Sequence, residues 1–148
     1  MKNMGNRHLY RGKRTDNGEW VEGFYFCMTH PDGRHTHHFI IPLGADLSLG
    51  TPVEKIQVEV DPNTICQCTG LKDKNGNLIW ENDIVAYWDS YSTESGLAEA
   101  DCVGKVVWDN ETISFQVTNR LSAESYEVLD DECSVIGNTF DNPELLEV

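Results

Sequence analysis

Tight-turn signals divide this chain into short segments, and their spacing most constrains its fold. Asn-Gly or Asp-Gly dipeptides stand at 17–18, 32–33 and 75–76. Such dipeptides tolerate the positive φ angles that two-residue hairpin turns require. No stretch has the amphipathic period of a three-turn helix. Short strands separated by close turns predict a mainly β fold, organised as a small barrel or sandwich.

Alternating apolar residues mark the expected strands of the first half. EWVEGFYFC, residues 19–27, places Trp20 and Phe24 on one face and Val21 and Tyr25 on the other. Because both faces carry apolar residues, the segment predicts a hairpin that is partly covered on both sides. Further strands are expected over RHTHHFIIP (34–42), KIQVEV (55–60) and TICQC (64–68).

The second half predicts more short strands, interrupted by one long loop. The strand segments are LIW, DIVAYW, CVGKVVW, TISFQV, YEVL and CSVIGNTF. Between two of them, residues 89–101 (DSYSTESGLAEAD) contain four acids and no base, and are expected to form a functional or mobile loop. In the tail, Asn142 as a cap and Pro143 at the first helical position predict a single helical turn.

Charge is distributed unevenly along the chain. Residues 1–76 contain nine Lys/Arg and nine Asp/Glu, whereas residues 77–148 contain two basic and 16 acidic residues and so carry the whole net charge of −14. An acidic half repels phosphate backbones, so it is not expected to grip nucleic acid directly. One local basic cluster stands near the start, at Arg7, Arg11, Lys13 and Arg14.

The length of the apolar runs and the spacing of the cysteines indicate the cellular compartment in which the protein is expected. No run approaches 18 apolar residues, and the N-terminal MKNMGNRHLYRGKR lacks the apolar core of a signal peptide. We therefore expect a soluble, cytoplasmic protein with no membrane partner. The five cysteines lack the spacing of a disulfide framework, which favours reduced and partly buried thiols.

Three sequence blocks carry a resemblance that spans nearly the whole chain. YRGKRTDNGEWVEG near the start, VDPNTICQCTGLKDKNGNLIWENDIV in the middle and VIGNTFDNPELL at the end resemble the YopX-like family of phage and prophage proteins. The resemblance implies a largely β protein, an SH3-like barrel over roughly 78–139, and a phage-derived gene expressed in a bacterial host cell. It supplies no activity, cofactor or catalytic residue.

The resemblance and the turn signals together predict three parts. These are an N-terminal β-rich region over 1–68, a connector over 69–77, and an SH3-like barrel with a C-terminal tail over 78–148. At the barrel entry, Asn82 stands where the resemblance leads us to expect glycine, and asparagine best replaces glycine in a left-handed conformation. Asp83 is expected to accept hydrogen bonds from turn amides rather than to work with Glu81 as a hydrolytic pair, because no partner base is visible.

A group of soft ligands in the first half is the best candidate for a metal site. Cys27 and His30, followed by His35 and His37, supply the ligand types of tetrahedral zinc. Alternation along a strand sends His38 to the face opposite His35 and His37, so only part of the cluster can converge. Exposed strand and turn histidines are therefore the preferred interpretation, and no metal or cofactor is predicted.

Two sets of residues are candidates for partner binding. The aromatic set stands beside the expected loop, where SH3-like barrels present aromatics to ligands, and consists of Tyr87, Trp88 and Tyr91. The basic set consists of Arg11, Lys13 and Arg14, with Trp20 and Tyr25 on the same predicted sheet. Trp108, in contrast, is expected to pack in a core.

Catalytic signatures are absent from the sequence. It contains no Gly-x-Ser-x-Gly motif, no cysteine in a nucleophile setting and no glycine-rich phosphate loop. We therefore predict a phage-derived, non-enzymatic protein that binds a protein partner or assembles with itself as a homo-oligomer. A nucleic-acid-associated protein using the basic N-terminal strand is the alternative hypothesis, and a metal-dependent enzyme is the third.

Overall fold

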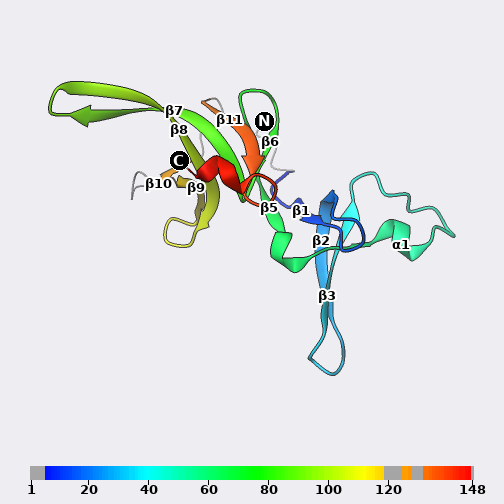
Figure 1. The fold of residues 1–148 in the computed structure, drawn as a ribbon. Coiled ribbons are helices and arrows are strands. Elements are labelled where there is room, and N and C mark those ends of the chain that lie inside the picture. Colours follow the sequence, from blue (N-terminus) through cyan, green and yellow to red (C-terminus); the bar gives the residue numbers. More distant parts are fainter. Residues whose placement is uncertain (1–5, 119–124, 128–131, 148) are drawn as a thin grey trace. The chain divides into compact units, whose positions relative to one another are not determined.

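The chain folds into two compact units, Met1–Cys68 and Thr69–Val148. A computed structural model describes residues 6–118, 125–127 and 132–147, and for 89–93, 97–100 and 125–127 it describes the backbone alone. Strands dominate, as predicted, and the helices within the described residues are single short turns (Figure 1). None of these helices has the length or the apolar character that a membrane crossing requires.

Unit 1 is an antiparallel sheet with the strand order β4-β3-β2-β1-β5. Its strands are β1 (Tyr10–Lys13), β2 (Trp20–Thr29), β3 (Thr36–Pro42), β4 (Val58–Glu59) and the first part of β5 (Cys66–Lys72), which crosses the unit boundary. Gly18 and Gly33 adopt φ angles of 75° and 70° in the turns that the dipeptides predict. The small core of the unit consists of Leu9, Ile40, Val58, Val60, Cys66 and Cys68.

The strand predicted over 55–60 is wrong in its first half. Residues Val53–Ile56 form the helical turn α1, and only Val58–Glu59 pair as β4. Pro52 precedes the helix with φ −59°, and its carbonyl accepts a hydrogen bond from the Lys55 amide at 3.0 Å. A proline at the cap has a fixed φ and no amide that would be left unpaired, so the helical turn begins directly after it in place of the predicted strand. A second turn, η2 (Pro62–Thr64), precedes β5.

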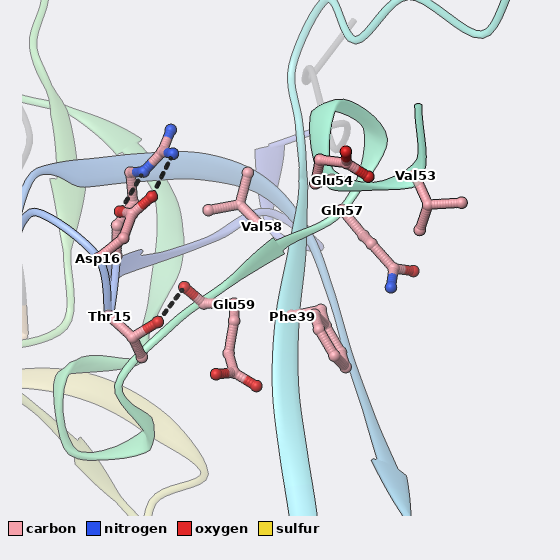
Figure 2. A pocket seen from close by; sticks show the side chains of 9 residues that line it. Thr15, Asp16, Phe39, Val53, Glu54, Gln57, Val58 and Glu59 are labelled. Atoms are coloured by element: carbon pink, nitrogen blue, oxygen red, sulfur yellow. Dashed lines mark hydrogen bonds and ion pairs between the residues drawn. The ribbon is translucent and has the colours of Figure 1, made fainter. Parts of the chain in front are cut away.

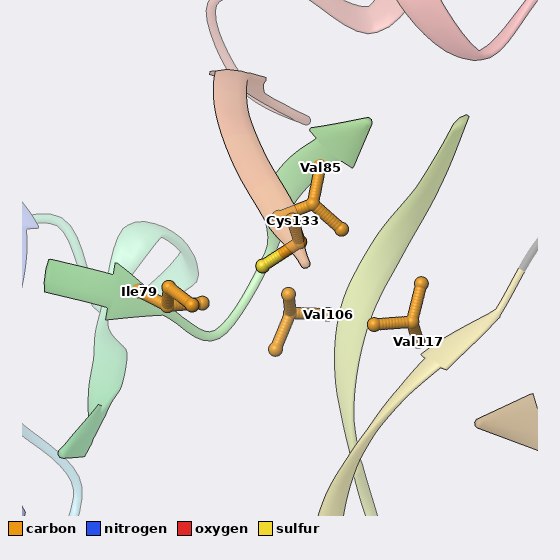
Figure 3. Packing of buried hydrophobic residues seen from close by; sticks show 5 residues of the cluster. All are labelled: Ile79, Val85, Val106, Val117 and Cys133. Carbon is orange, nitrogen blue, oxygen red and sulfur yellow. The ribbon is translucent and has the colours of Figure 1, made fainter. Parts of the chain in front are cut away.

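Unit 2 contains a five-stranded antiparallel sheet with the order β10-β9-β8-β7-β11. Its strands are β7 (Asp83–Thr93), β8 (Gly96–Asp109), β9 (Ser114–Thr118), β10 (Ser125–Glu127) and β11 (Cys133–Asn138), while β6 (Leu78–Trp80) pairs with β5. Figure 3 shows the buried cluster of this unit, formed by Ile79, Val85, Val106, Val117 and Cys133. Within the described residues, β10 and β11 are the two edges of this sheet, so no closed barrel is found and the SH3-like barrel stays a prediction.

The long loop predicted over 89–101 is wrong, because β7 and β8 continue through it as a hairpin. Their pairing runs from Ile84↔Lys105 to Thr93↔Gly96. In the described part of the chain, β11 accompanies β7 only as far as Tyr87 and β9 accompanies β8 only from Lys105. Residues 88–93 and 96–101 thus form a two-stranded arm (Figure 1). Backbone hydrogen bonds can hold such an arm together without the alternation of apolar and polar residues that indicates a strand packed on a core.

Two buried aspartates organise the start of unit 2. Asp73 Oδ1 accepts the amides of Asn75 and Asn77 at 2.9 and 2.8 Å, and Oδ2 accepts the amide of Val135 at 2.9 Å. Asp83 Oδ2 accepts the Trp80 amide at 2.8 Å, which confirms the predicted turn role. Asn82 has φ 68°, which confirms the left-handed turn. Both carboxylates hold turns together.

The C-terminal tail forms the predicted single turn, η3 (Pro143–Leu146), which lies against β8. Asn142 does not cap it with its side chain. Its Oδ1 instead accepts the backbone amide of Asn138 at 3.3 Å, while the side chain of Asn138 accepts the amides of Phe140 and Asp141. The asparagines thus stabilise the turn before η3.

Candidate functional site

An exposed apolar surface covers one side of the β2–β3 hairpin in unit 1. The register pairs Phe24 with Ile41 and Phe26 with Phe39, and directly opposite residues of antiparallel strands share a face. Met28 lies further along the same face. Phe24 is 45% and Met28 60% exposed, and the other three side chains are half-buried. We call these five residues the aromatic face.

Ring contacts organise the aromatic face. Phe26 and Phe39 stack with their ring centroids 5.3 Å apart, and His8 stacks on Phe24 at 5.5 Å with an angle of 11° between the planes. Stacked aromatic pairs prefer such spacings and restrict the motion of the rings. A contiguous apolar surface on a sheet is typical of an interaction site, whereas scattered apolar residues are not.

The predicted basic residues divide into two groups. The Arg11 guanidinium lies 4.6 Å and the Lys13 ammonium 5.4 Å from the centroid of the Trp20 ring. Lys13 is opposite Trp20 in the register, so this cation–π cluster shares the face of Phe24. Arg14 instead donates two hydrogen bonds to Asp16, at 2.9 and 2.8 Å. The hydrogen bond from Arg14 lowers the pKa of the Asp16 carboxyl.

A pocket of about 360 Å³ lies beside this ion pair (Figure 2). Its lining residues are Arg14, Thr15, Asp16, Phe39, Val53, Glu54, Gln57, Val58 and Glu59. The only basic side chain among them, Arg14, already binds Asp16, and Glu54 and Glu59 are exposed to solvent. The pocket therefore presents neither a free cation for an anionic ligand nor a buried acid for catalysis.

The predicted metal candidates lie on two different faces. Cys27 is opposite His38 in the register, and His38 Nδ1 is 2.7 Å from the Tyr25 hydroxyl. His30, His35 and His37 lie near the tip of the hairpin, on the face opposite Cys27. Cys27 is therefore separated from the histidines. Over the described residues, no group of three or more His, Cys, Asp or Glu side chains is arranged to hold a metal ion.

The aromatic candidates of unit 2 do not form one groove. Tyr87 is half-buried against the core cluster, whereas Trp88 is 54% exposed. The side chain of Tyr91 lies outside the described residues. Trp108 is exposed at the end of β8, edge-on to Phe115 at 5.0 Å, so its predicted place in the core is wrong. Val106 is the residue of β8 that belongs to the buried cluster, and β8 continues beyond it to Asp109, so Trp108 lies outside the cluster.

The sequence indicated two of the five residues of the aromatic face and did not single them out as a site. The alternation of β2 placed Phe24 and Phe26 on one side, but the partners Phe39 and Ile41 stand in the unbroken apolar run FII, which has no alternation. Only the register shows that Ile40 points to the core while its two neighbours face outward. The preceding residues His37 and His38 are both polar, so they did not indicate which face of β3 is buried either.

Comparisons with known proteins agree with the described fold. No curated protein matches the chain. A solved structure, the crystal structure of protein EF1440 from Enterococcus faecalis, is similar with a TM-score of 0.50 and 27% sequence identity, over 93% of this chain and 96% of that chain. The family model described as YopX protein matches residues 9–147. The chain therefore belongs to the YopX family.

Proposed function

We propose that this protein is a non-enzymatic interaction protein that assembles with a second copy of itself through the aromatic face of unit 1. The observation that carries the proposal is the exposure of Phe24 and Met28 beside the stacked pair Phe26–Phe39. Burying such side chains against a partner removes apolar area from water. We further propose, from the resemblance, a phage-derived gene and action in the cytoplasm of a bacterial host.

The distribution of charge favours a second copy as the occupant of this face. Residues 1–68 contain seven Lys/Arg and eight Asp/Glu, a net charge of −1, whereas residues 69–148 contain four and 17, a net charge of −13. Two copies that meet through unit 2 bring like charges together, which costs free energy. Unit 1 carries almost no net charge, so this penalty is small there.

The face also carries charges of both signs next to its apolar residues. Arg11 and Glu22 are directly opposite each other in the register, and Lys13 lies two residues from Arg11 on the same side. A two-fold interface brings the same patch of both copies together, so it must be complementary to itself. A patch with both charge signs around an apolar centre meets this requirement.

Analytical ultracentrifugation of the full chain tests the proposal. The parent protein is expected to form a dimer or larger assembly in the micromolar range, and Phe24→Ser to shift the equilibrium toward the monomer. Ile113→Ser is the matched control, because Ile113 is an apolar side chain of unit 2 that is 74% exposed. A monomeric parent, or an equal loss of assembly in both variants, would refute the proposal.

Nucleic-acid association is a second candidate, favoured by the cation–π cluster. Two cations beside Trp20, on a face with exposed Phe24, combine the charges and the rings that single-stranded nucleic acids contact. Electrophoretic shifts with DNA and RNA at low salt are expected to show binding that Arg11→Glu with Lys13→Glu weakens. The absence of any shift would remove this candidate.

A further inference from the structure

Three imidazole rings gather on one side of the β2–β3 hairpin tip. The ring centroid of His30 is 5.1 Å from that of His37 and 6.0 Å from that of His35. His30 and His35 close the turn, with the His30 amide donating to the His35 carbonyl at 2.8 Å. The hairpin backbone therefore holds the three side chains close to one another.

In two of the three rings, a carboxylate determines which nitrogen carries the proton. His35 Nδ1 is 3.0 Å from Asp32 Oδ2, and His37 Nδ1 is 2.6 Å from Glu59 Oε2. An ionised carboxylate only accepts hydrogen bonds, so Nδ1 is the donor in both rings. In the neutral ring, Nε2 then carries the free lone pair. Metal-binding histidines have this arrangement, in which a carboxylate orients the ring through the nitrogen that does not bind the metal.

The ring spacing is close to that of a shared metal ion. With Zn–N bonds of about 2.0–2.1 Å in tetrahedral geometry, the centres of two ligating imidazoles lie about 5 Å apart. The His30–His37 separation equals this spacing and the His30–His35 separation exceeds it by about 1 Å. The three nitrogens do not yet surround one point, in agreement with the lack of a ready-made three-ligand group in the described residues. The His35 side chain is 70% exposed, so rotation of its ring meets little steric resistance.

We propose that His30, His35 and His37 bind one divalent ion of the late first-row metals, Zn²⁺ or Cu²⁺, and that His35 and His37 do so through their Nε2 atoms. Imidazole nitrogen suits both ions. Asp32 and Glu59 hold the Nδ1 protons, and water completes the coordination. The proposal does not depend on self-assembly, because all of these residues belong to one hairpin and the adjoining strand of one copy.

Isothermal titration of the untagged, reduced full chain with zinc sulfate, and separately with copper sulfate, tests this site. The expected result is saturable binding of one ion per chain. His30→Gln and His37→Gln are each expected to weaken binding at least about tenfold. Cys27→Ser is the matched control, because Cys27 lies on the other face of the same strand and its loss should leave the affinity unchanged. Circular dichroism checks that each exposed-site variant keeps the parent fold.

The carboxylates provide a test that a group of unrelated surface histidines would fail. Glu59→Ala removes the acceptor of His37 Nδ1 and is expected to weaken binding about tenfold while the stoichiometry stays at one ion. Three results would overturn the proposal. These are no saturable binding of either ion, unchanged affinity after His30→Gln combined with His37→Gln, and full affinity in Glu59→Ala.

Discussion

The two units use similar antiparallel strands in opposite ways. Unit 2 encloses a cluster of five buried side chains and carries a net charge of −13. Unit 1 has a net charge of −1 and leaves five aromatic and aliphatic side chains on one face of a hairpin. Two buried carboxylates, Asp73 and Asp83, hold the turns of unit 2.

This difference indicates that unit 2 contributes mainly to the stability of the single chain and unit 1 to its association with another molecule. In unit 2, apolar burial and satisfied buried carboxylates stabilise one chain, and the surface charge keeps copies of that unit apart. In unit 1, part of the apolar surface stays in water until another molecule covers it. Substitutions in unit 2 should therefore change the free energy of unfolding, while those on the aromatic face should change assembly.

Removal of a core side chain in unit 2 is expected to have the largest effect. Ile79 is fully buried in the cluster of Figure 3. Ile79→Ala should lower the free energy of unfolding by about 3–4 kcal/mol, because it removes apolar burial and leaves a cavity. Urea denaturation measures the loss. Ile113→Ala, at a position of the same unit that is 74% exposed and has φ 53°, should cause no loss of stability, because it uncovers no core and a β-branched residue is itself strained in the left-handed region. Equal effects of the two substitutions would contradict the described core.

Replacement of Asp73 is expected to have the next largest effect. Asp73→Ala leaves the amides of Asn75, Asn77 and Val135 without their acceptor and should cost about 2–3 kcal/mol. Burial raises the pKa of this carboxyl, but the hydrogen bonds from Val135, Asn77 and Asn75 outweigh it, so the net pKa is lowered.

The lowered pKa makes the contribution of Asp73 depend on pH with a definite sign. A carboxyl with a lower pKa in the folded state contributes stability above its ordinary pKa of about 4, and that stability is lost as the pH falls through the folded value. Unfolding curves between pH 7 and pH 2 should therefore show a steeper acid loss for the parent than for Asp73→Ala. Parallel pH profiles would contradict this role.

Substitution in the connector turn should lower the free energy of unfolding less than Asp73→Ala does. Gly76 has φ 83°, and no atom lies within 4 Å of where a Cβ would be, so the cost of a side chain there is one of backbone conformation alone. Gly76→Val should cost about 1–3 kcal/mol, because a β-branched residue is strained in this region. Gly76→Asn should cost less, since asparagine tolerates it. A Val variant with parent stability but lost assembly would refute the structural role of this turn.

The aromatic face should show the smallest effect on stability. Phe24→Ser is expected to lower the free energy of unfolding, measured at a concentration where the protein is monomeric, by only about 1 kcal/mol, since nearly half of the side chain is already exposed. Its effect on assembly should be large. A loss of stability as great as that of Ile79→Ala would mean that Phe24 belongs to the core.

Local chemistry made part of the fold predictable. Turn dipeptides, the left-handed Asn82 and the turn-binding Asp83 depend on neighbours in sequence, and the structure confirms them. The β7–β8 arm was missed because residues 89–101 carry no apolar alternation in their sequence, although their backbones pair as strands. The SH3-like barrel was implied by the resemblance and stays a prediction, since the described strands form a sheet with edges at β10 and β11.

The surfaces were harder to predict, because they depend on register between distant strands. The sequence placed Arg11, Lys13 and Trp20 on one sheet, and the structure brings them within cation–π distance. It could not show that Arg14 binds Asp16, or that His30 lies beside His37 across the hairpin. Nor could it show which residue of the run Phe39, Ile40, Ile41 enters the core.

Hydroxyl-radical footprinting of the full chain, at a concentration below and one above the assembly range, tests the contrast between the units most directly. Oxidation of Phe24 and Met28 is expected to fall on assembly, while oxidation of Trp88 and Ile113 should stay unchanged, although all four side chains are exposed in the single chain. Protection of Trp88 or Ile113 with continued oxidation of Phe24 and Met28 would contradict this expectation and assign association to unit 2.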